Sequence, residues 1–355
     1  MLIRLTPTAT NPILCCMNAD IFRHSDLPFP RSLPDFQRLF PNDEACATYL
    51  ERIRWEHGFV CPHCGQAGEP FRFANRPQVL RCRGCRRDIA LTAGTVMERT
   101  HTPLSTWFWA AYLVASHTAG MSATQFQRQL GLSRYETAFQ ILHKLRAGMV
   151  RPDRDRIGSA GSHVEVDETW IGGATRGEGR GKHNQTLVIA AIEVRERAPG
   201  KEGGKVRRQG RYAGRLRMEV VPNRGAKALV GFVESAVDPG AMIITDAAPS
   251  YARLTERGFQ HLPVVEGNDP AVAEEYLPIV HLVFSNLKSW LRGCHHGVSA
   301  KHLQAYLNEF TFRFNRRFYP FNAFRSLLGI GGEAHAPTYA ELYEGEWQHP
   351  TVSAQ

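Results

Sequence analysis

The chain has 355 residues, of which 43% are hydrophobic, so it is long enough to hold two or three globular domains. It carries 43 Lys and Arg against 34 Asp and Glu, and this net charge of +9 favours a polyanionic partner. The cysteines show no disulfide-framework spacing, no secretory signal opens the chain, and no run of about 18 apolar residues predicts a membrane span. We therefore expect a cytoplasmic protein with no membrane partner.

The N-terminal segment 1–33 lacks a clear helix or strand pattern and is predicted to be poorly structured, with Met17 as an alternative start. Residues 34–56 then predict a short helical lead-in, because apolar side chains recur there at helical spacing.

Four cysteines form two CxxC pairs with 17 residues between them. These are Cys61, Cys64, Cys82 and Cys85. Two such pairs present four thiolates to one tetrahedral ion, and the residues between them suit a small β-hairpin. The spacing predicts a zinc ribbon with structural Zn²⁺, so that 34–100 forms the lead-in and the ribbon. Redox thiols are the alternative, although a redox site needs only one CxxC.

Residues 101–151 predict three helices, the last two of which are separated by a turn at Gly131. Segments 122–125 and 133–136 each match a capping box, Ser-x-x-Gln and Ser-x-x-Glu. Helix, turn and capped helix together are typical of a helix-turn-helix. Outward positions of the last helix are suited to contact a DNA groove, among them Arg134, Gln140 and Lys144. Alternatively, these helices only pack the ribbon against the next domain.

Segment 152–162 is rich in Asp, Arg, Gly and Ser and predicts a linker. Beyond it, three strands, a helix, a further strand and more helices predict a mixed α/β domain over 163–330, followed by a tail at 331–355. The predicted fold class is therefore an α+β multidomain protein.

Two loops of this domain are strongly basic, at 174–184 and 195–215. The second carries eight Arg and Lys, including Arg207 and Arg208. A solvated loop is the usual interpretation of such a run, but its place beside a candidate catalytic strand makes contact with DNA phosphates an equal alternative.

Two aspartates stand where strands are predicted. Asp167 lies inside the strand 164–171, and Asp246 directly follows the short apolar strand 242–245. If these strands are neighbours, the two carboxylates lie side by side and can hold Mg²⁺ ions that activate a hydroxyl for phosphodiester displacement. Buried acids without cations would be costly, which supports a metal site.

Three motifs resemble the bacterial insertion-sequence transposases of the zinc-ribbon DDE type, a group related to the Merlin elements. They are V-E-V-D-E-T-W-I-G-G at 164–173, I-T-D-A-A-P-S-Y at 244–251 and the long motif at 284–317 that begins F-S-N-L-K-S-W-L-R-G. The resemblance covers roughly 34–330. It implies a ribonuclease-H-like catalytic domain and Mg²⁺- or Mn²⁺-dependent cutting at the ends of the element. It also implies joining of the freed 3′ hydroxyls to target DNA, in the bacterial nucleoid. Asp167 and Asp246 match the first two acids of the family.

The third acid of the family pattern is missing, because residues 276–308 contain no Asp or Glu. Relatives resembling this chain carry Asn in place of Glu, so Asn286 is assigned as the third metal ligand. His281 is the alternative, since it precedes Lys288 by the spacing that separates Glu from Lys in Glu-bearing relatives. Lys288 is expected to contact a DNA phosphate, and Glu309 is a weaker candidate ligand whose context looks structural.

Three functions remain open at this point. A transposase that acts as a homodimer or larger assembly on paired DNA ends is the leading interpretation. A non-catalytic DNA-binding regulator is supported by the missing acid, and a nuclease of the same fold is the third alternative.

Overall fold

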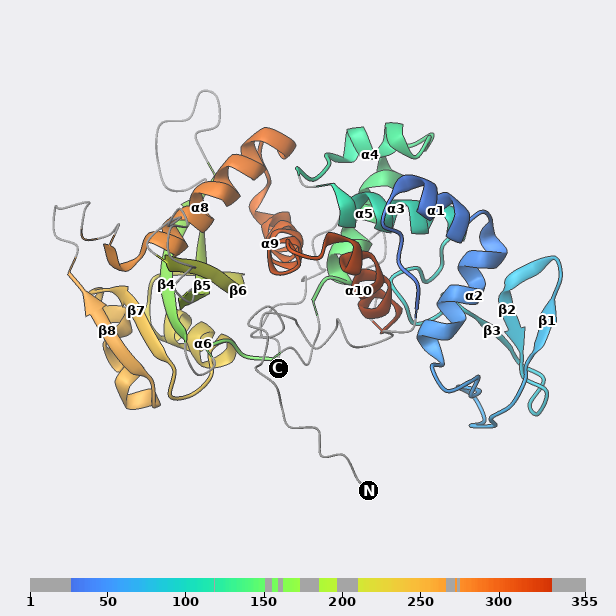
Figure 1. Cartoon of the computed structure of the whole chain (residues 1–355), viewed down its shortest axis with the longest axis horizontal. Coiled ribbons are helices and arrows are strands. Elements are labelled where there is room, and N and C mark those ends of the chain that lie inside the picture. Colours follow the sequence, from blue (N-terminus) through green and yellow to red (C-terminus); the bar gives the residue numbers. More distant parts are fainter. Residues whose placement is uncertain are drawn as a thin grey trace, which may run out of the picture.

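The computed structural model of the chain describes residues 27–117, 119–150, 155–158, 162–172, 185–196, 210–265, 272 and 275–333. Figure 1 shows an N-terminal unit, made of a ribbon and helices, and a sheet unit, with two C-terminal helices between them. No helix within these described ranges is long and apolar enough to cross a membrane.

The N-terminal unit contains two helices, a three-stranded antiparallel sheet and three further helices. In chain order these are α1 (Leu33–Leu39), α2 (Asp43–Arg54), β1 (Phe71–Phe73), β2 (Arg76–Arg81), β3 (Asp88–Ala90), α3 (Leu104–Ser116), α4 (Ala123–Gln129) and α5 (Tyr135–Ala147). One CxxC pair precedes β1 and the other lies between β2 and β3. This order confirms the predicted zinc-ribbon region.

The junction of α4 and α5 follows the predicted pattern in part. Ser122 caps α4, because its Oγ accepts a hydrogen bond from the backbone N–H of Gln125 at 3.2 Å. Gly131 takes the left-handed conformation (φ +62°) that the turn requires. The second capping box is wrong, however. α5 is preceded by Arg134 as its N-cap residue, which makes no side-chain capping bond, so Ser133 lies one position too early.

The C-terminal helix α10 (Pro320–Glu333) packs into the N-terminal unit and not onto the sheet. Its Phe324 lies 5.5 Å from Phe40 and 6.2 Å from Phe36 between ring centroids, in one buried aromatic cluster. Arg325 donates a hydrogen bond to the backbone oxygen of Leu27, which is only 2% exposed. The packing of α10 differs from the predicted domain end at 330, since apolar burial draws both Leu27 and α10 into the N-terminal core. Of the segment 1–33 that is predicted to be poorly structured, residues 1–26 lie outside the described residues.

The sheet unit has five strands in the order β6-β5-β4-β7-β8. Its elements are β4 (Ser162–Ile171), β5 (Thr186–Glu196), β6 (Arg211–Val220), α6 (Ala226–Ala236), β7 (Met242–Asp246), η5 (Pro249–Arg257), β8 (Gln260–Val264), α8 (Pro278–Trp290), η6 (Leu291–His295) and α9 (Ala300–Asn315). β4, β5 and β6 are antiparallel neighbours, whereas β7 and β8 run parallel to β4. The predicted mixed α/β fold is confirmed, although β8 was not predicted.

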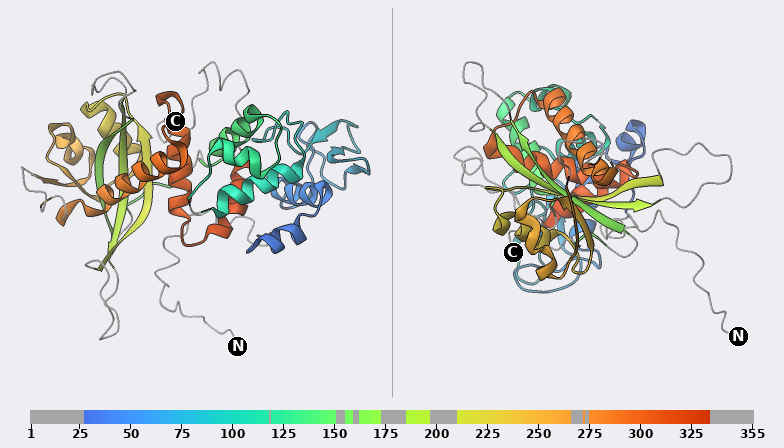
Figure 2. Two further views of the ribbon diagram at one scale, coloured as in Figure 1. Left: turned by 90° about the horizontal axis from the view of Figure 1, so that it is seen from above. Right: turned by 90° about the vertical axis from the view of Figure 1, so that its left-hand side faces the viewer.

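The two faces of this sheet are covered by different helices. Val164 and Val166 of β4 pack in a core with α6 and η5, whereas Val188 of β5 and Ile244 of β7 pack in a second core with α8 and α9. Figure 2 shows α9 between the sheet and the N-terminal helices. Because side chains alternate along a strand, residues 165, 167 and 169 of β4 face α8.

Candidate active site and zinc site

Asp167 and Asp246 lie on neighbouring strands near the centre of the sheet. β4 and β7 are parallel, with His163 opposite Met242 and Glu165 opposite Ile244. Continuing this register by two residues places Asp246 beside Asp167. Both side chains then lie on the face that α8 covers, because side chains alternate along each strand.

The two carboxylates repel each other. Burial raises the pKa of Asp246, and the negative charge of Asp167 raises it further. The backbone N–H of Ala248 donates to Asp246 Oδ1 at 3.3 Å, a long hydrogen bond that does not offset these effects. Adjacent, half-buried carboxylate oxygens are the ligands that Mg²⁺ and Mn²⁺ prefer, and a divalent cation between them would remove the repulsion.

The side chain that α8 brings to this pair is His281. Its Nε2 lies 3.2 Å from Asp167 Oδ2, and the two side chains are 39% and 15% exposed. A neutral imidazole is a common ligand of transition-metal ions, whereas Mg²⁺ prefers oxygen ligands. His281, the alternative third ligand from the sequence, therefore occupies the position beside the aspartates.

Asn286 lies on another side of α8. It follows His281 by five residues, which at about 100° per residue turns it about 140° around the helix. Its exposed side chain lines a groove together with Ser116 and Trp290. The structure therefore does not bring Asn286 to the aspartates. The sequence pattern put it at the margin of the buried face, and that margin faces the N-terminal unit.

Two contacts with β4 set the position of α8. Glu165 Oε2 accepts hydrogen bonds from the backbone N–H groups of Ile279 at 2.9 Å and Val280 at 2.7 Å, in the first turn of the helix. Further along, Lys288 Nζ donates to Thr169 Oγ1 at 2.7 Å. These contacts lie on either side of His281 and fix the rotation that turns its ring toward Asp167.

Glu168 forms a second polar cluster on the opposite face of β4. It accepts hydrogen bonds from Tyr251 Oη and Arg224 Nε, both at 2.6 Å. Burial raises the pKa of Glu168, whereas its two partners lower it, and the charges of Asp167 and Asp246 raise it again. Sequence reasoning missed Glu165, Glu168, Arg224 and Tyr251 as site residues. Two of these residues had a signal in the sequence, since Glu168 is adjacent to Asp167 and Tyr251 lies in the motif at 244–251.

The four ribbon cysteines form a compact cluster in which all sulfur atoms lie within 4.8 Å of one another. Two of the Sγ–Sγ distances, Cys61 to Cys85 and Cys64 to Cys82, are 3.7 Å. A tetrahedral zinc with Zn–S bonds of about 2.3 Å requires sulfur atoms about 3.8 Å apart. The thiols thus fit a structural zinc ion.

The sheet unit and the ribbon part of the N-terminal unit match two known domain families. Residues 159–315 match the model of the ISXO2-like transposase domain, and residues 41–88 match that of the transposase zinc-ribbon domain. The chain belongs to the zinc-ribbon DDE transposases of insertion sequences. The first match ends with α9, in keeping with the packing of α10 elsewhere. No curated protein and no solved structure matches the transposase.

The predicted DNA-contacting side chains of the helix-turn-helix are only partly available. Arg134 is exposed at the start of α5, and Gln140 is half-buried. Lys144 Nζ donates to the backbone oxygen of Glu98 at 3.0 Å, and burial lowers its pKa. Since α9 packs against α5, the exposed residues of the transposase in this region lie on α4, at the α4–α5 turn and at the start of α5.

The basic segment 195–215 is described at its two ends, while Arg207 and Arg208 lie outside the described residues, as does the loop 174–184. At one end, Arg215 donates to Glu193 at 2.9 Å and Arg195 does so at 3.2 Å. These two arginines are thus bound to a buried carboxylate at the base of the segment.

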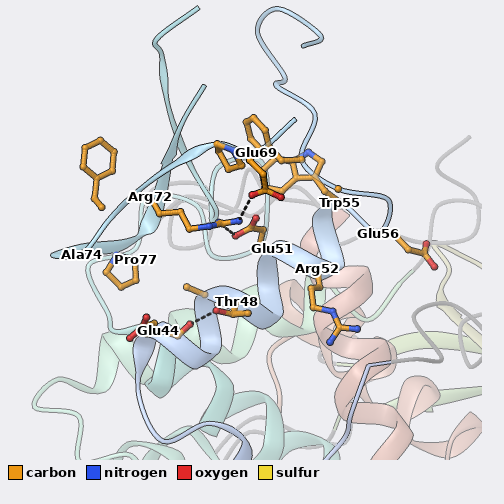
Figure 3. Close-up of a pocket in the computed structure, with 15 residues that line it drawn as sticks. Glu44, Thr48, Glu51, Arg52, Trp55, Glu56, Glu69, Arg72, Ala74 and Pro77 are labelled. Atoms are coloured by element: carbon orange, nitrogen blue, oxygen red, sulfur yellow. Dashed lines mark hydrogen bonds and ion pairs between the residues drawn. The ribbon is translucent and has the colours of Figure 1, made fainter. Parts of the chain in front are cut away.

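A groove of about 680 Å³ lies between α2 and the ribbon of the transposase (Figure 3). Four glutamates line it, and Arg72 pairs with Glu51 at 2.5 Å and with Glu69 at 3.4 Å. Two arginines, Arg52 and Arg72, lie beside the four glutamates, so the net charge of the lining is negative and disfavours phosphate groups.

Proposed function

We propose that the transposase cleaves phosphodiester bonds at the ends of its insertion element and joins the freed 3′ hydroxyls to target DNA. The observation that carries this proposal is the pair formed by Asp167 and Asp246 on adjacent parallel strands, with His281 against it. Mg²⁺ or Mn²⁺ would be held by these three side chains. When bound, two such ions activate the attacking hydroxyl and stabilise the leaving oxygen of an in-line displacement.

The arrangement supports distinct roles for the three ligands. Asp167 neighbours both Asp246, by the register of β4 and β7, and His281, so it can serve as the shared ligand. A neutral imidazole supplies no charge, which leaves the two aspartates to balance the cations. Glu165 and Lys288 are positioning residues, because they hold α8 and with it His281.

DNA recognition is assigned to the N-terminal unit. The ribbon and the exposed tip around Arg134 would bind the ends of the element, and two copies of the chain would bring two ends together. Because the acidic groove of Figure 3 disfavours phosphates, DNA would meet the ribbon on its other sides.

Cleavage of a duplex that carries the DNA flanking this gene tests the proposal. The intact protein should cut it and form joined products with Mg²⁺, whereas Asp167→Asn and Asp246→Asn proteins should bind equally well without cutting. These substitutions keep the side-chain shape and remove only the charge.

Two outcomes would refute the proposal. An intact protein that binds but never cuts would be a DNA-binding regulator, and cutting without joined products would identify a nuclease of this fold.

A further inference from the structure

A groove of about 490 Å³ lies at the junction of the N-terminal and sheet units, apart from the candidate active site. We call it the junction groove. The end of α3, one side of α8, α9 and the turn after it supply its walls. Its lining includes Ser116, Asn286, Trp290, Phe310, Arg313 and Phe314.

The charge of this lining is positive. The residues that line the groove include Arg313, Arg316 and Arg317, and none of the described lining residues is acidic. Two of these arginines are held by backbone oxygens, Arg313 by that of His117 and Arg317 by that of Phe314 at 2.7 Å. A hydrogen bond to a neutral carbonyl leaves the charge of a guanidinium uncancelled, although Arg313 also pairs with the buried Glu309 at 3.4 Å. Because Arg146 shares that one carboxylate, the junction keeps a positive charge. An anionic ligand is therefore favoured.

Aromatic rings complete the junction groove. Trp290 and Phe310 lie 5.7 Å apart between centroids, and Phe310 stacks with Phe314 at 6.1 Å. Rings beside arginines are typical of sites that stack the bases of single-stranded nucleic acid while contacting the backbone. The exposed amide of Asn286 adds a hydrogen-bonding group suited to a base edge. A duplex is too wide for a cavity of this size, but a single unpaired nucleotide fits.

The junction groove lies within reach of a strand held at the aspartates. α8 carries His281 near one end and Trp290 at the other, about 14 Å apart along the helix axis and about 180° apart around it. A strand that joins them must also pass around the helix, so the span corresponds to at least about four nucleotides at about 3.4 Å each.

We propose that the junction groove binds an unpaired nucleotide of the DNA strand whose scissile phosphate lies at the active site. The proposal rests on the proposed function for the identity of the strand. It gives Asn286 a role in DNA binding in place of metal binding.

Fluorescence anisotropy without divalent metal tests this proposal. The probes are a blunt duplex, the same duplex with a four-nucleotide single-stranded tail, and a third with an abasic tail. The full chain should bind the tailed duplex about tenfold more tightly than the blunt one, and the abasic tail should give little of this gain. Ser116→Phe, which fills the groove, and Asn286→Ala, at an exposed position, should reduce the preference to below about threefold.

Ser235→Phe on α6 is the matched control. Like Ser116, Ser235 is half-buried and bonds a backbone oxygen in the preceding turn of its own helix, but it lies on the far face of the sheet. This variant should keep the full tail preference. Equal binding of blunt and tailed duplexes by the intact chain would overturn the proposal, as would an unchanged preference in both groove variants or full preference for the abasic tail. Cleavage of DNA with Mg²⁺ is measured separately. A chain that binds the tailed duplex preferentially but never cuts DNA would refute only the proposed function.

Discussion

Glu309 offers a direct test of the division between structural and catalytic acids. The sequence leaves it as a weak candidate for the third metal ligand, yet the structure buries it on α9 against Arg146 of α5. The Nε–Oε2 distance is 2.8 Å, and the side chains are 2% and 3% exposed. Burial alone would raise the pKa of Glu309, but the charges of Arg146 and Arg313 outweigh it and lower that pKa.

Glu309→Gln should therefore destabilise the fold by leaving the Arg146 charge buried without its partner. Such a loss typically costs about 3–5 kcal/mol. The Tyr306 ring, 4.0 Å from the Arg146 guanidinium carbon, keeps part of the stabilisation through a cation–π contact. We expect the lower end, about 3 kcal/mol, and a fall in Tm of roughly 5–10 °C.

Urea unfolding and thermal unfolding measure this change. The double variant Arg146→Met, Glu309→Leu should recover much of the loss, since it removes both charges and keeps apolar volume. Asp88→Asn breaks an exposed ion pair with Arg81 and serves as the control with little effect on Tm. An unchanged Tm in Glu309→Gln would refute the reasoning, as would a raised Mg²⁺ requirement below its Tm, because the second result would make Glu309 a metal ligand.

His281→Ala should raise the Mg²⁺ concentration for half-maximal cleavage at least about tenfold, whereas Asn286→Ala should leave it within about twofold; the opposite pattern would restore Asn286 as the ligand. Removing zinc with a strong chelator should release a single ion per chain and abolish DNA-end binding, and Mg²⁺ alone should not restore it; binding by zinc-free protein would contradict a folding role. Arg215 and two backbone N–H groups overcome the effect of burial and lower the pKa of Glu193 from 4.5 to about 2. A carboxylate whose pKa is lowered by folding stabilises the fold fully above its unfolded-state pKa and loses that contribution as the pH falls to its folded-state pKa. The free energy of unfolding should therefore fall by about 3 kcal/mol as the pH falls from 4.5 toward 2. The free energy of unfolding of the Glu193→Gln protein should change less with pH over that range than that of the intact protein. Equal pH dependence in the two proteins would exclude this contribution.

The features that sequence predicts well here depend on local spacing. The two CxxC pairs define the ribbon because each knuckle closes within four residues. The strand that carries Asp167 is visible as an alternating pattern, and the strand before Asp246 as a short apolar run.

The rest depends on contacts between distant segments. The choice between His281 and Asn286 depends on the rotation of α8, which Glu165 and Thr169 hold from a strand more than 100 residues away. Helical periodicity defines a buried face but leaves the rotation of its margin open by tens of degrees. That margin is where the two candidates differ.

The same reason explains why the predicted DNA-contacting positions of α5 are only partly exposed. Ala138, Ile141 and Leu142 are buried as helical spacing predicts, but His143 and Arg146 are buried as well. The second buried side exists because α9 packs there, and α9 begins more than 150 residues later. A helix covered on two sides exposes only its first turn, so the groove-reading surface is shorter than a single amphipathic face predicts.

The position of α9 links recognition to chemistry in the transposase. It packs on β6 in the sheet unit and on α5 in the N-terminal unit, and its Glu309 forms the buried ion pair with Arg146 between them. Trp290 Nε1 adds a hydrogen bond to the backbone oxygen of Ala119 at 3.1 Å. A hinge at this junction would have to break this ion pair and the Trp290 hydrogen bond together, which disfavours such a motion. DNA bound at the tip of α4 and α5 would therefore be presented to Asp167 and Asp246 in one fixed orientation, with the junction groove beside its path.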